Sequence, residues 1–247
     1  MRRHRLFSPA LSTGSVMLSP EESHHVIASL RAKVGHEVAV FDGAGGEGVG
    51  LIVRIERRRV FVDVTQVMHR PFELRHRITL AVAMIRTHRQ GYLIEKCTEL
   101  GVAAIWPIIA ERNVSRPDAA AVERWSRRAV EAAKQSNRSW VPAIPAPRAF
   151  SECLERLGDF HASSITHADS TLVPFTAFLS AQTDGASVLV WVGPEGGWSD
   201  TERDLVVEAG AVPTTLSPMV LRTETAAVAV CAAAAMHAVV TGSGRAE

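Results

Sequence analysis

The first 70 residues show the spacing of a small all-β unit. Three short runs alternate apolar and polar positions or are rich in β-branched residues, and glycines and charges separate them: 37–41, 50–55 and 59–64. This pattern predicts a small β-barrel or sheet. A helix is expected from about Glu21 to Leu30, because Ser19-Pro20 supplies a cap and a first helical position.

After residue 78 the pattern changes to alternating strands and helices. Apolar strands are expected at 79–85, 104–109, 187–193 and 211–216. Helices are expected from the end of the first of these strands to Leu100, at about 118–136, at 199–210 and from 223 onward. The near-continuous apolar strands are typical of a parallel sheet covered on both faces. We therefore predict two domains, 1–70 and 78–247, joined by a linker at about 71–77, where Pro71 interrupts the pattern.

Composition supports a folded chain in a reducing compartment. Of its 247 residues, 47% are hydrophobic and 21% charged, so a sizeable core is expected. The three cysteines lack the spacing of a disulfide framework or a metal site. The longest apolar run, 226–240, falls short of the roughly 20 residues of a membrane span and is expected to be a buried helix. We expect no export signal and a cytoplasmic protein without a metal.

Charge is distributed unevenly along the chain. Residues 1–148 hold 23 Lys and Arg against 14 Asp and Glu, whereas residues 149–247 hold 4 against 12. A basic first part suits a polyanionic partner, since Lys and Arg neutralise phosphates and release counterions. Ordinary surface charge that maintains solubility explains the same numbers, and charge alone does not separate the two interpretations.

The segment Val192-Gly-Pro-Glu-Gly-Gly-Trp-Ser199 is the strongest local signal for a binding site. It follows a predicted buried strand and precedes Ser199-Asp-Thr-Glu202, a helix-capping box. Ligands of open α/β sheets bind beyond the carboxyl ends of the strands, and paired glycines let a backbone approach a ligand closely. A tight turn without any ligand is the alternative. The segment matches neither a dinucleotide-binding nor a phosphate-loop pattern.

A second loop, Leu216 to Ala226, also joins a predicted strand to a predicted helix. Arg222 and Glu224 lie at the junction. The helix dipole is a sufficient structural reason for Glu224, and Arg222 could be an ordinary ion-pair partner. Two such loops at neighbouring strand ends can nevertheless line one pocket. The scattered histidines lack metal-ligand spacing, and a Gly-x-Ser-x-Gly hydrolase elbow is absent from the sequence.

Taken together, these segments resemble the bacterial small-subunit ribosomal RNA uridine N3-methyltransferase family, within the knotted SPOUT superfamily. The resembling segments are His4–Phe7, His24-His25 through Gly35, Phe41–Gly43, Glu95–Val102, Glu131–Arg138 with Val141-Pro142, Gly193–Gly197 and Leu221–Ala226. The last two are specific in combination.

The resemblance implies an N-terminal PUA-like β-barrel that binds RNA and a C-terminal α/β SPOUT domain with a deep trefoil knot. It also implies a homodimer and S-adenosylmethionine (SAM) as cofactor. By match, one cofactor loop consists of Gly193, Pro194, Glu195, Gly196 and Gly197, and the other of Leu216, Leu221, Arg222, Thr223, Glu224 and Ala226.

Two segments depart from the family pattern. Ser217-Pro218 stands where Leu-Gly is common, and a positive φ at this serine would be costly, so a reshaped loop is expected. The segment 86–91 replaces a more usual lysine-rich run that carries an acidic residue, which leaves the roles of Arg86 and Arg89 open.

The chemistry expected of this family is methyl transfer to uridine N3 in small-subunit (16S) ribosomal RNA. Arg222 is the candidate for stabilising the uridine anion, and Glu224 for orienting Arg222 or accepting the N3 proton. Contacts to RNA phosphates are expected from Arg2, Arg3, Arg5, Arg31, Lys33, Arg86, Arg112 and Arg138. Methylation of another base or of a ribose 2′-OH, and a catalytically silent ribosome-assembly protein, remain alternatives.

Overall fold

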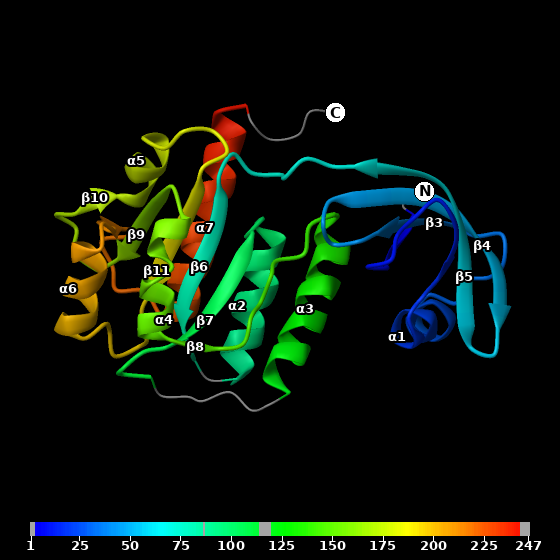
Figure 1. Ribbon diagram of the computed structural model, residues 1–247, viewed down its shortest axis with the longest axis horizontal. Coiled ribbons are helices and arrows are strands. Elements are labelled where there is room, and N and C mark those ends of the chain that lie inside the picture. Colours follow the sequence, from blue (N-terminus) through cyan, green and yellow to red (C-terminus); the bar gives the residue numbers. More distant parts are fainter. Residues whose placement is uncertain (1–2, 86, 114–119, 243–247) are drawn as a thin grey trace. The chain divides into compact units, whose positions relative to one another are not determined.

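The computed structural model describes residues 3–85, 87–113 and 120–242 and divides the chain into two compact units. The first unit comprises Met1–Phe72 together with Ala133–Val141, and the second comprises Glu73–Ala132 and Pro142–Glu247. Figure 1 shows the helices and strands of both units.

The first unit is built on a five-stranded sheet in the order β1-β3-β4-β5-β2. Its strands are β1 (His4–Phe7), β2 (Gly14–Met17), β3 (Glu37–Phe41), β4 (Gly46–Glu56) and β5 (Arg59–His69). β1 pairs with β3 in parallel, and the other pairs are antiparallel. The buried face carries Leu6, Val38 and Ile52, all fully shielded from solvent. The predicted β unit is thus present, with two short strands that the sequence pattern did not indicate.

The predicted helix after Ser19 is present over nearly the expected residues, but it changes type part-way. α1 runs over Pro20–His24 and continues as a π-helical turn over His25–Ser29. The Ser19 side chain accepts a hydrogen bond from the N–H of Glu22 at 3.1 Å, which confirms the predicted cap.

A segment of the predicted α/β region, Ala133–Val141, belongs to the first unit. The Arg5 side chain donates to the carbonyl of Arg138 at 2.9 Å, and Lys134 Nζ lies 2.6 Å from a carboxylate oxygen of Glu22. Both partners of this ion pair are more than 90% buried. The predicted domain of 78–247 included this segment. Contacts between residues so far apart in the sequence leave no periodic pattern from which they could be predicted.

The second unit is a seven-stranded sheet in the order β10-β12-β9-β11-β6-β7-β8, and all its strand pairs are parallel. Its strands are β6 (Arg77–Ala83), β7 (Ala104–Ile109), β8 (Arg148–Ala149), β9 (Ala162–Thr166), β10 (Val173–Pro174), β11 (Ser187–Val192) and β12 (Val212–Thr215). Its helices are α2 (Thr87–Glu99), α3 (Ala121–Ser136, whose last residues belong to the first unit), α4 (Phe150–Leu154), α5 (Phe175–Ser180), α6 (Asp200–Glu208) and α7 (Thr223–Val240), with a 3-10 turn at Leu157–Asp159. The predicted parallel α/β architecture is confirmed.

Both faces of this sheet are covered. α7 packs against α2 and α5 and along β6 and β11, whereas α4 and α6 pack against β7 and β9 (Figure 1). α7 has the length and hydropathy of a membrane span. Its packing against the sheet and two other helices is that of a core helix.

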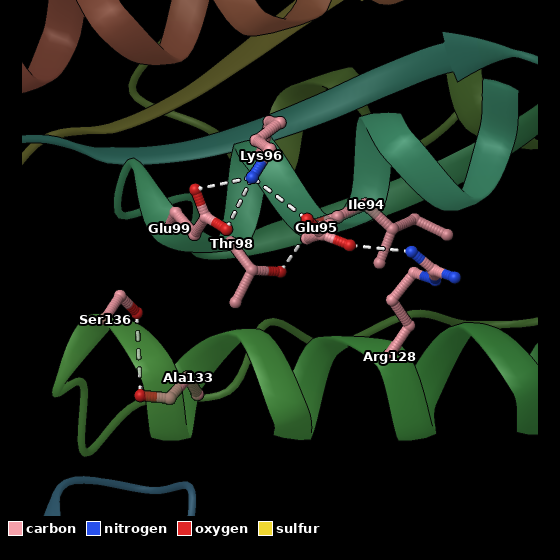
Figure 2. A network of polar contacts seen from close by, with 8 residues as sticks. All are labelled: Ile94, Glu95, Lys96, Thr98, Glu99, Arg128, Ala133 and Ser136. Atoms are coloured by element: carbon pink, nitrogen blue, oxygen red, sulfur yellow. Dashed lines mark hydrogen bonds and ion pairs between the residues drawn. The ribbon is translucent and has the colours of Figure 1, made fainter.

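A polar network ties α2 to α3. Arg128 lies 2.6 Å from one carboxylate oxygen of Glu95, whose other oxygen lies 2.9 Å from Lys96 Nζ (Figure 2). Lys96 also contacts Glu99 at 2.8 Å. These groups are partly exposed, so solvent screens the pairs and they add little to stability, and the Arg128–Glu95 pair is the contact of this network that joins the two helices.

Candidate functional site

A cavity of about 410 Å³ opens at the carboxyl ends of three neighbouring parallel strands, β9, β11 and β12. This is the edge at which open α/β sheets bind ligands. The lining comes from the loops that follow β7, β9, β11 and β12 and from the start of two helices: Arg112, Thr166–Ala168, Val192–Trp198, Asp200, Arg203, Leu216, Ser217, Met219–Leu221, Thr223 and Ala226. The structure therefore brings together the two loops that the sequence analysis singled out.

The glycines of the first loop have separate geometric roles. Gly197 has φ +70 and its N–H donates to the carbonyl of Pro194 at 2.8 Å, which closes the turn. Any larger residue at Gly193 would place its Cβ 3.1 Å from the indole nitrogen of Trp198, which is closer than most Cβ contacts in proteins. These constraints keep the loop's peptide groups, rather than side chains, at the cavity wall.

Arg112 supports this loop through two hydrogen bonds. Its guanidinium donates to the carbonyls of Gly196 at 3.1 Å and Trp198 at 3.2 Å. Arg112 was expected to contact RNA phosphates, but in the structure it lies in the wall of the cavity and makes these two bonds. Both bonds come from the same terminal nitrogen, Nη1, whose two N–H groups can each serve one carbonyl.

The second loop accommodates Ser217 without a positive φ. The Ser217 side chain accepts a hydrogen bond from the N–H of Met219 at 3.0 Å, and its carbonyl accepts one from the Thr215 hydroxyl at 3.3 Å. The conformational strain expected for a serine with positive φ is therefore absent at Ser217, because its hydroxyl stabilises a different turn. The apolar side chains of Met219 and Val220 stay 65% and 85% exposed at the cavity.

One hydrogen bond joins the two loops directly. The hydroxyl of Thr223, at the start of α7, donates to the carbonyl of Gly193 at 2.8 Å, and Thr223 is buried. Of the second predicted set, Leu216, Leu221, Thr223 and Ala226 line the cavity. Arg222 and Glu224 do not line it.

Glu224 faces a residue that the sequence analysis left without a role. One carboxylate oxygen of this buried glutamate lies 3.6 Å from Arg89, and Arg89 also lies 3.9 Å from the carboxylate of Glu195. Within the described part of the chain, the other Glu224 oxygen has no hydrogen-bond partner. Glu224 therefore pairs with Arg89 of α2, which corrects the expectation that it orients Arg222.

Arg89 was missed because its partners lie far along the chain. It stands in the third position of α2, directly after β6, and β6 lies beside β11 in the sheet. The start of α2 therefore lies near the loop that follows β11. The unusual segment 86–91 was the only signal in the sequence.

Arg222 is exposed and has the cap position of α7, where its carbonyl accepts from the N–H of Ala226 at 2.8 Å. Its neighbours on both sides line the cavity. Its side chain makes no hydrogen bond or ion pair with any described residue. A guanidinium in this position is free to meet a bound anion.

The predicted phosphate contacts fall into three groups. Arg5 and Arg138 are buried in the first unit, and Arg5 lies 3.2 Å from Glu47, so neither presents its charge to solvent. Arg31 and Lys33 are exposed, whereas the exposed Arg3 is paired with Glu37 at 2.7 Å. Arg2 and Arg86 lie outside the described residues.

The cysteines and histidines form no metal-binding group among the described residues. Cys97, Cys153 and Cys231 are all free and buried. Burial raises the pKa of Cys153 to about 11 and the pKa of Cys97 well above its usual value, so these thiols stay protonated near neutral pH.

Comparison with known proteins assigns the chain to a family. Residues 72–235 match a family described as an RNA methyltransferase domain, and residues 18–65 match an RNA methyltransferase PUA domain. The chain belongs to the RNA methyltransferase family. A curated relative, ribosomal RNA small subunit methyltransferase E of Synechocystis, is 31% identical over 86% of this chain and 70% of its own length.

Solved structures of the family extend the likeness to the whole fold. A Legionella pneumophila protein in complex with SAM is 30% identical, with a TM-score of 0.85 over 97% of this chain and 98% of that one. Ribosomal RNA small subunit methyltransferase E of Neisseria gonorrhoeae, bound to SAM, is 28% identical, with a TM-score of 0.81 over 94% and 96%. The chain thus joins an N-terminal PUA-like domain to a C-terminal parallel-sheet methyltransferase domain.

Proposed function

We propose that this protein transfers a methyl group from SAM to N3 of a uridine in small-subunit (16S) ribosomal RNA. The observation that carries the proposal is the cavity at the ends of β9, β11 and β12, where the Gly193–Gly197 loop and the Leu216–Ala226 loop meet through the Thr223–Gly193 hydrogen bond. The family membership and the SAM-bound relatives support the choice of reaction and cofactor.

The cavity suits SAM in size and in chemistry. Its volume of about 410 Å³ lies in the usual range of small-molecule sites. Its walls combine the backbone of the Gly193–Gly197 loop with apolar side chains such as Leu216 and Leu221, a mixture that suits the adenosyl group of SAM. We assign cofactor binding to Gly193–Gly197, Leu216, Leu221, Thr223 and Ala226, and an indirect role to Glu224 through Arg89.

The sulfonium of SAM supplies an activated methyl group and makes a metal unnecessary. The remaining tasks fall to residues of the chain, which must orient uridine N3 and stabilise the negative charge that develops when its proton leaves. Arg222 is the candidate for this stabilisation, because it is an exposed cation between two cavity-lining residues. Glu224 does not line the cavity, so we assign it an indirect role in proton transfer, through the carboxylate oxygen that does not face Arg89.

The wider expectations of the family complete the proposal. They are a cytoplasmic protein, a homodimer, and a deep trefoil knot in the second domain, with domain limits near 1–70 and 78–247. The packing of α7 beside β6 and β11, after the loop that follows β12, is compatible with a knot. Light scattering of the purified protein tests the dimer, since a monomer mass at micromolar concentration would contradict it.

The function is tested by mass analysis of ribosomal RNA nucleosides from cells with and without the gene. Loss of 3-methyluridine on deletion, and its return on complementation, is the expected result. Another missing methylated base or ribose would reveal a different target, and calorimetry without SAM binding would indicate a silent assembly protein. An Arg222→Ala variant should lose methylation far more than SAM affinity, whereas Arg127→Ala on α3 should lose neither.

A further inference from the structure

The hairpin between β4 and β5 ends in a strained turn of two arginines. The last residue pair of the ladder is Glu56 with Arg59, so Arg57 and Arg58 alone form the loop. Their φ angles are +47 and +64, both in the left-handed region. Two central residues with positive φ define the type I′ turn, which matches the twist of the strands.

Arginine is a costly choice for this turn. Asn-Gly and Asp-Gly are the preferred pairs, because glycine has no Cβ and asparagine tolerates the left-handed conformation. A side chain that is retained in a strained backbone conformation points to a function of that side chain. The strain here lies at the exposed tip of two strands of 11 residues each.

The tip is also a cluster of cations with few partners. Arg57 and Arg58 are exposed and make no hydrogen bond or ion pair with any residue the structure describes. The Arg54 guanidinium lies 3.9 Å from the centre of the Phe61 ring, where stacking holds it in place beside the tip. With Arg59, four arginines fall within residues 54–59, against the single carboxylate of Glu56, which lies 3.5 Å from Arg54. Arg59 is half-buried and donates to the carbonyl of Leu18 at 3.4 Å, so Arg57 and Arg58 are the two members of the cluster without a partner among the described residues.

We propose that this arginine tip, Arg54 and Arg57–Arg59, is a binding site for the phosphate backbone of the RNA substrate. The proposal rests on the proposed function for the presence of RNA, and it adds a contact that the sequence analysis did not include. Exposed guanidiniums suit the purpose because their donor forks match phosphate oxygens. The match of residues 18–65 to an RNA methyltransferase PUA domain favours RNA over an acidic protein as the partner.

The turn allows a variant that removes charge without harming the fold. Arg57→Asn with Arg58→Gly installs the preferred turn pair, so the melting temperature should stay equal or rise. Binding to a small-subunit ribosomal RNA fragment should weaken. The slope of log affinity against log salt should become less negative by about 1.4 to 1.8, because two phosphate contacts are lost.

Two further variants separate charge from other effects. Arg127→Gln with Arg156→Gln removes the same net charge from exposed, ion-paired positions and should leave the salt slope near that of the wild type. Arg57→Lys with Arg58→Lys keeps the charge and should keep most of the slope. SAM affinity, measured by calorimetry, should not change in any of the three.

Two outcomes of the salt titration would overturn the proposal: an unchanged salt slope in the Asn-Gly variant, or an equal change of slope in the Arg127 and Arg156 control. A third would be a loss of affinity of the Asn-Gly variant for the assembled subunit but not for naked RNA, which would indicate a protein partner. Failure of the proposed function has a different signature. A wild-type enzyme that binds RNA with the tip-dependent slope but does not form 3-methyluridine would refute the reaction and leave the tip assignment standing.

Discussion

The bond between Thr223 and Gly193 gives the sharpest test of how the two cofactor loops are held together. Thr223→Val removes the hydroxyl and keeps the shape of the side chain. The lost hydrogen bond, 2.8 Å long and partly buried, is worth about 1 kcal/mol, and the Gly193 carbonyl left unpaired raises the loss to about 2 kcal/mol. If this free energy is expressed in cofactor binding, SAM affinity falls by roughly 5- to 30-fold.

Titration calorimetry with SAM measures the effect, and the chain contains a matched control. Thr225 lies two residues further along α7 and is exposed, so Thr225→Val removes an equivalent hydroxyl without breaking the link between the loops. Thr223→Ser keeps the donor and should retain most of the affinity. Equal SAM affinities for Thr223→Val and Thr225→Val would refute the idea that this bond couples the loops.

Three further predictions concern buried charge and the site's positioning residue. Lys134→Met leaves Glu22 buried without its partner and should destabilise the protein by about 3–5 kcal/mol in urea unfolding, most of which the added Glu22→Gln should restore. Arg89→Met should weaken SAM binding and lower kcat, whereas Arg89→Lys should rescue both in part, and a wild-type kcat in Arg89→Met would exclude a positioning role. Burial lowers the pKa of His76 in the folded protein below the ordinary value of 6.5. As the pH falls below about 6.5, the unfolded chain therefore binds a proton at His76 before the folded protein does, and the free energy of unfolding should decrease. Thermal unfolding between pH 7.5 and 5 measures this fall, which should be smaller in His76→Gln.

The strands of the methyltransferase domain were predictable where both of their faces are apolar. β7 has the predicted bounds, and β6 and β11 differ from prediction by one or two residues at their ends. β9 was missed because its sequence, Ala-Ser-Ser-Ile-Thr, does not resemble a buried strand. Its serines are satisfied inside the sheet, since Ser163 donates to the carbonyl of Leu189 and Ser164 bonds to Thr214. Hydroxyls paired in this way can replace apolar side chains in a core.

The assignment of arginines to RNA was less predictable, because a charge count does not distinguish a solvated guanidinium from an internal one. Arg5 reads as part of a basic N-terminus, yet it is buried and bonds to Glu47, Ser139 and the backbone of Arg138. Conversely, nothing in the sequence separates Arg57 and Arg58 from ordinary surface charge, and their positive φ angles are a property of the folded hairpin. In both cases the decisive partner or strain lies in the tertiary structure.

The same distinction separates the two arginines beside the cofactor loops. The loops themselves were recognisable because their glycines and helix caps are local in the sequence. Arg89 and Glu224 are paired across 135 residues, and no periodicity connects them. Arg89 faces two carboxylates, Arg112 holds two carbonyls, and Arg203 contacts Asp200 and Asp204. Among the described arginines in or next to the cavity lining, Arg222 therefore remains without a protein partner, and it is the guanidinium that a uridine anion would meet without first breaking an existing contact.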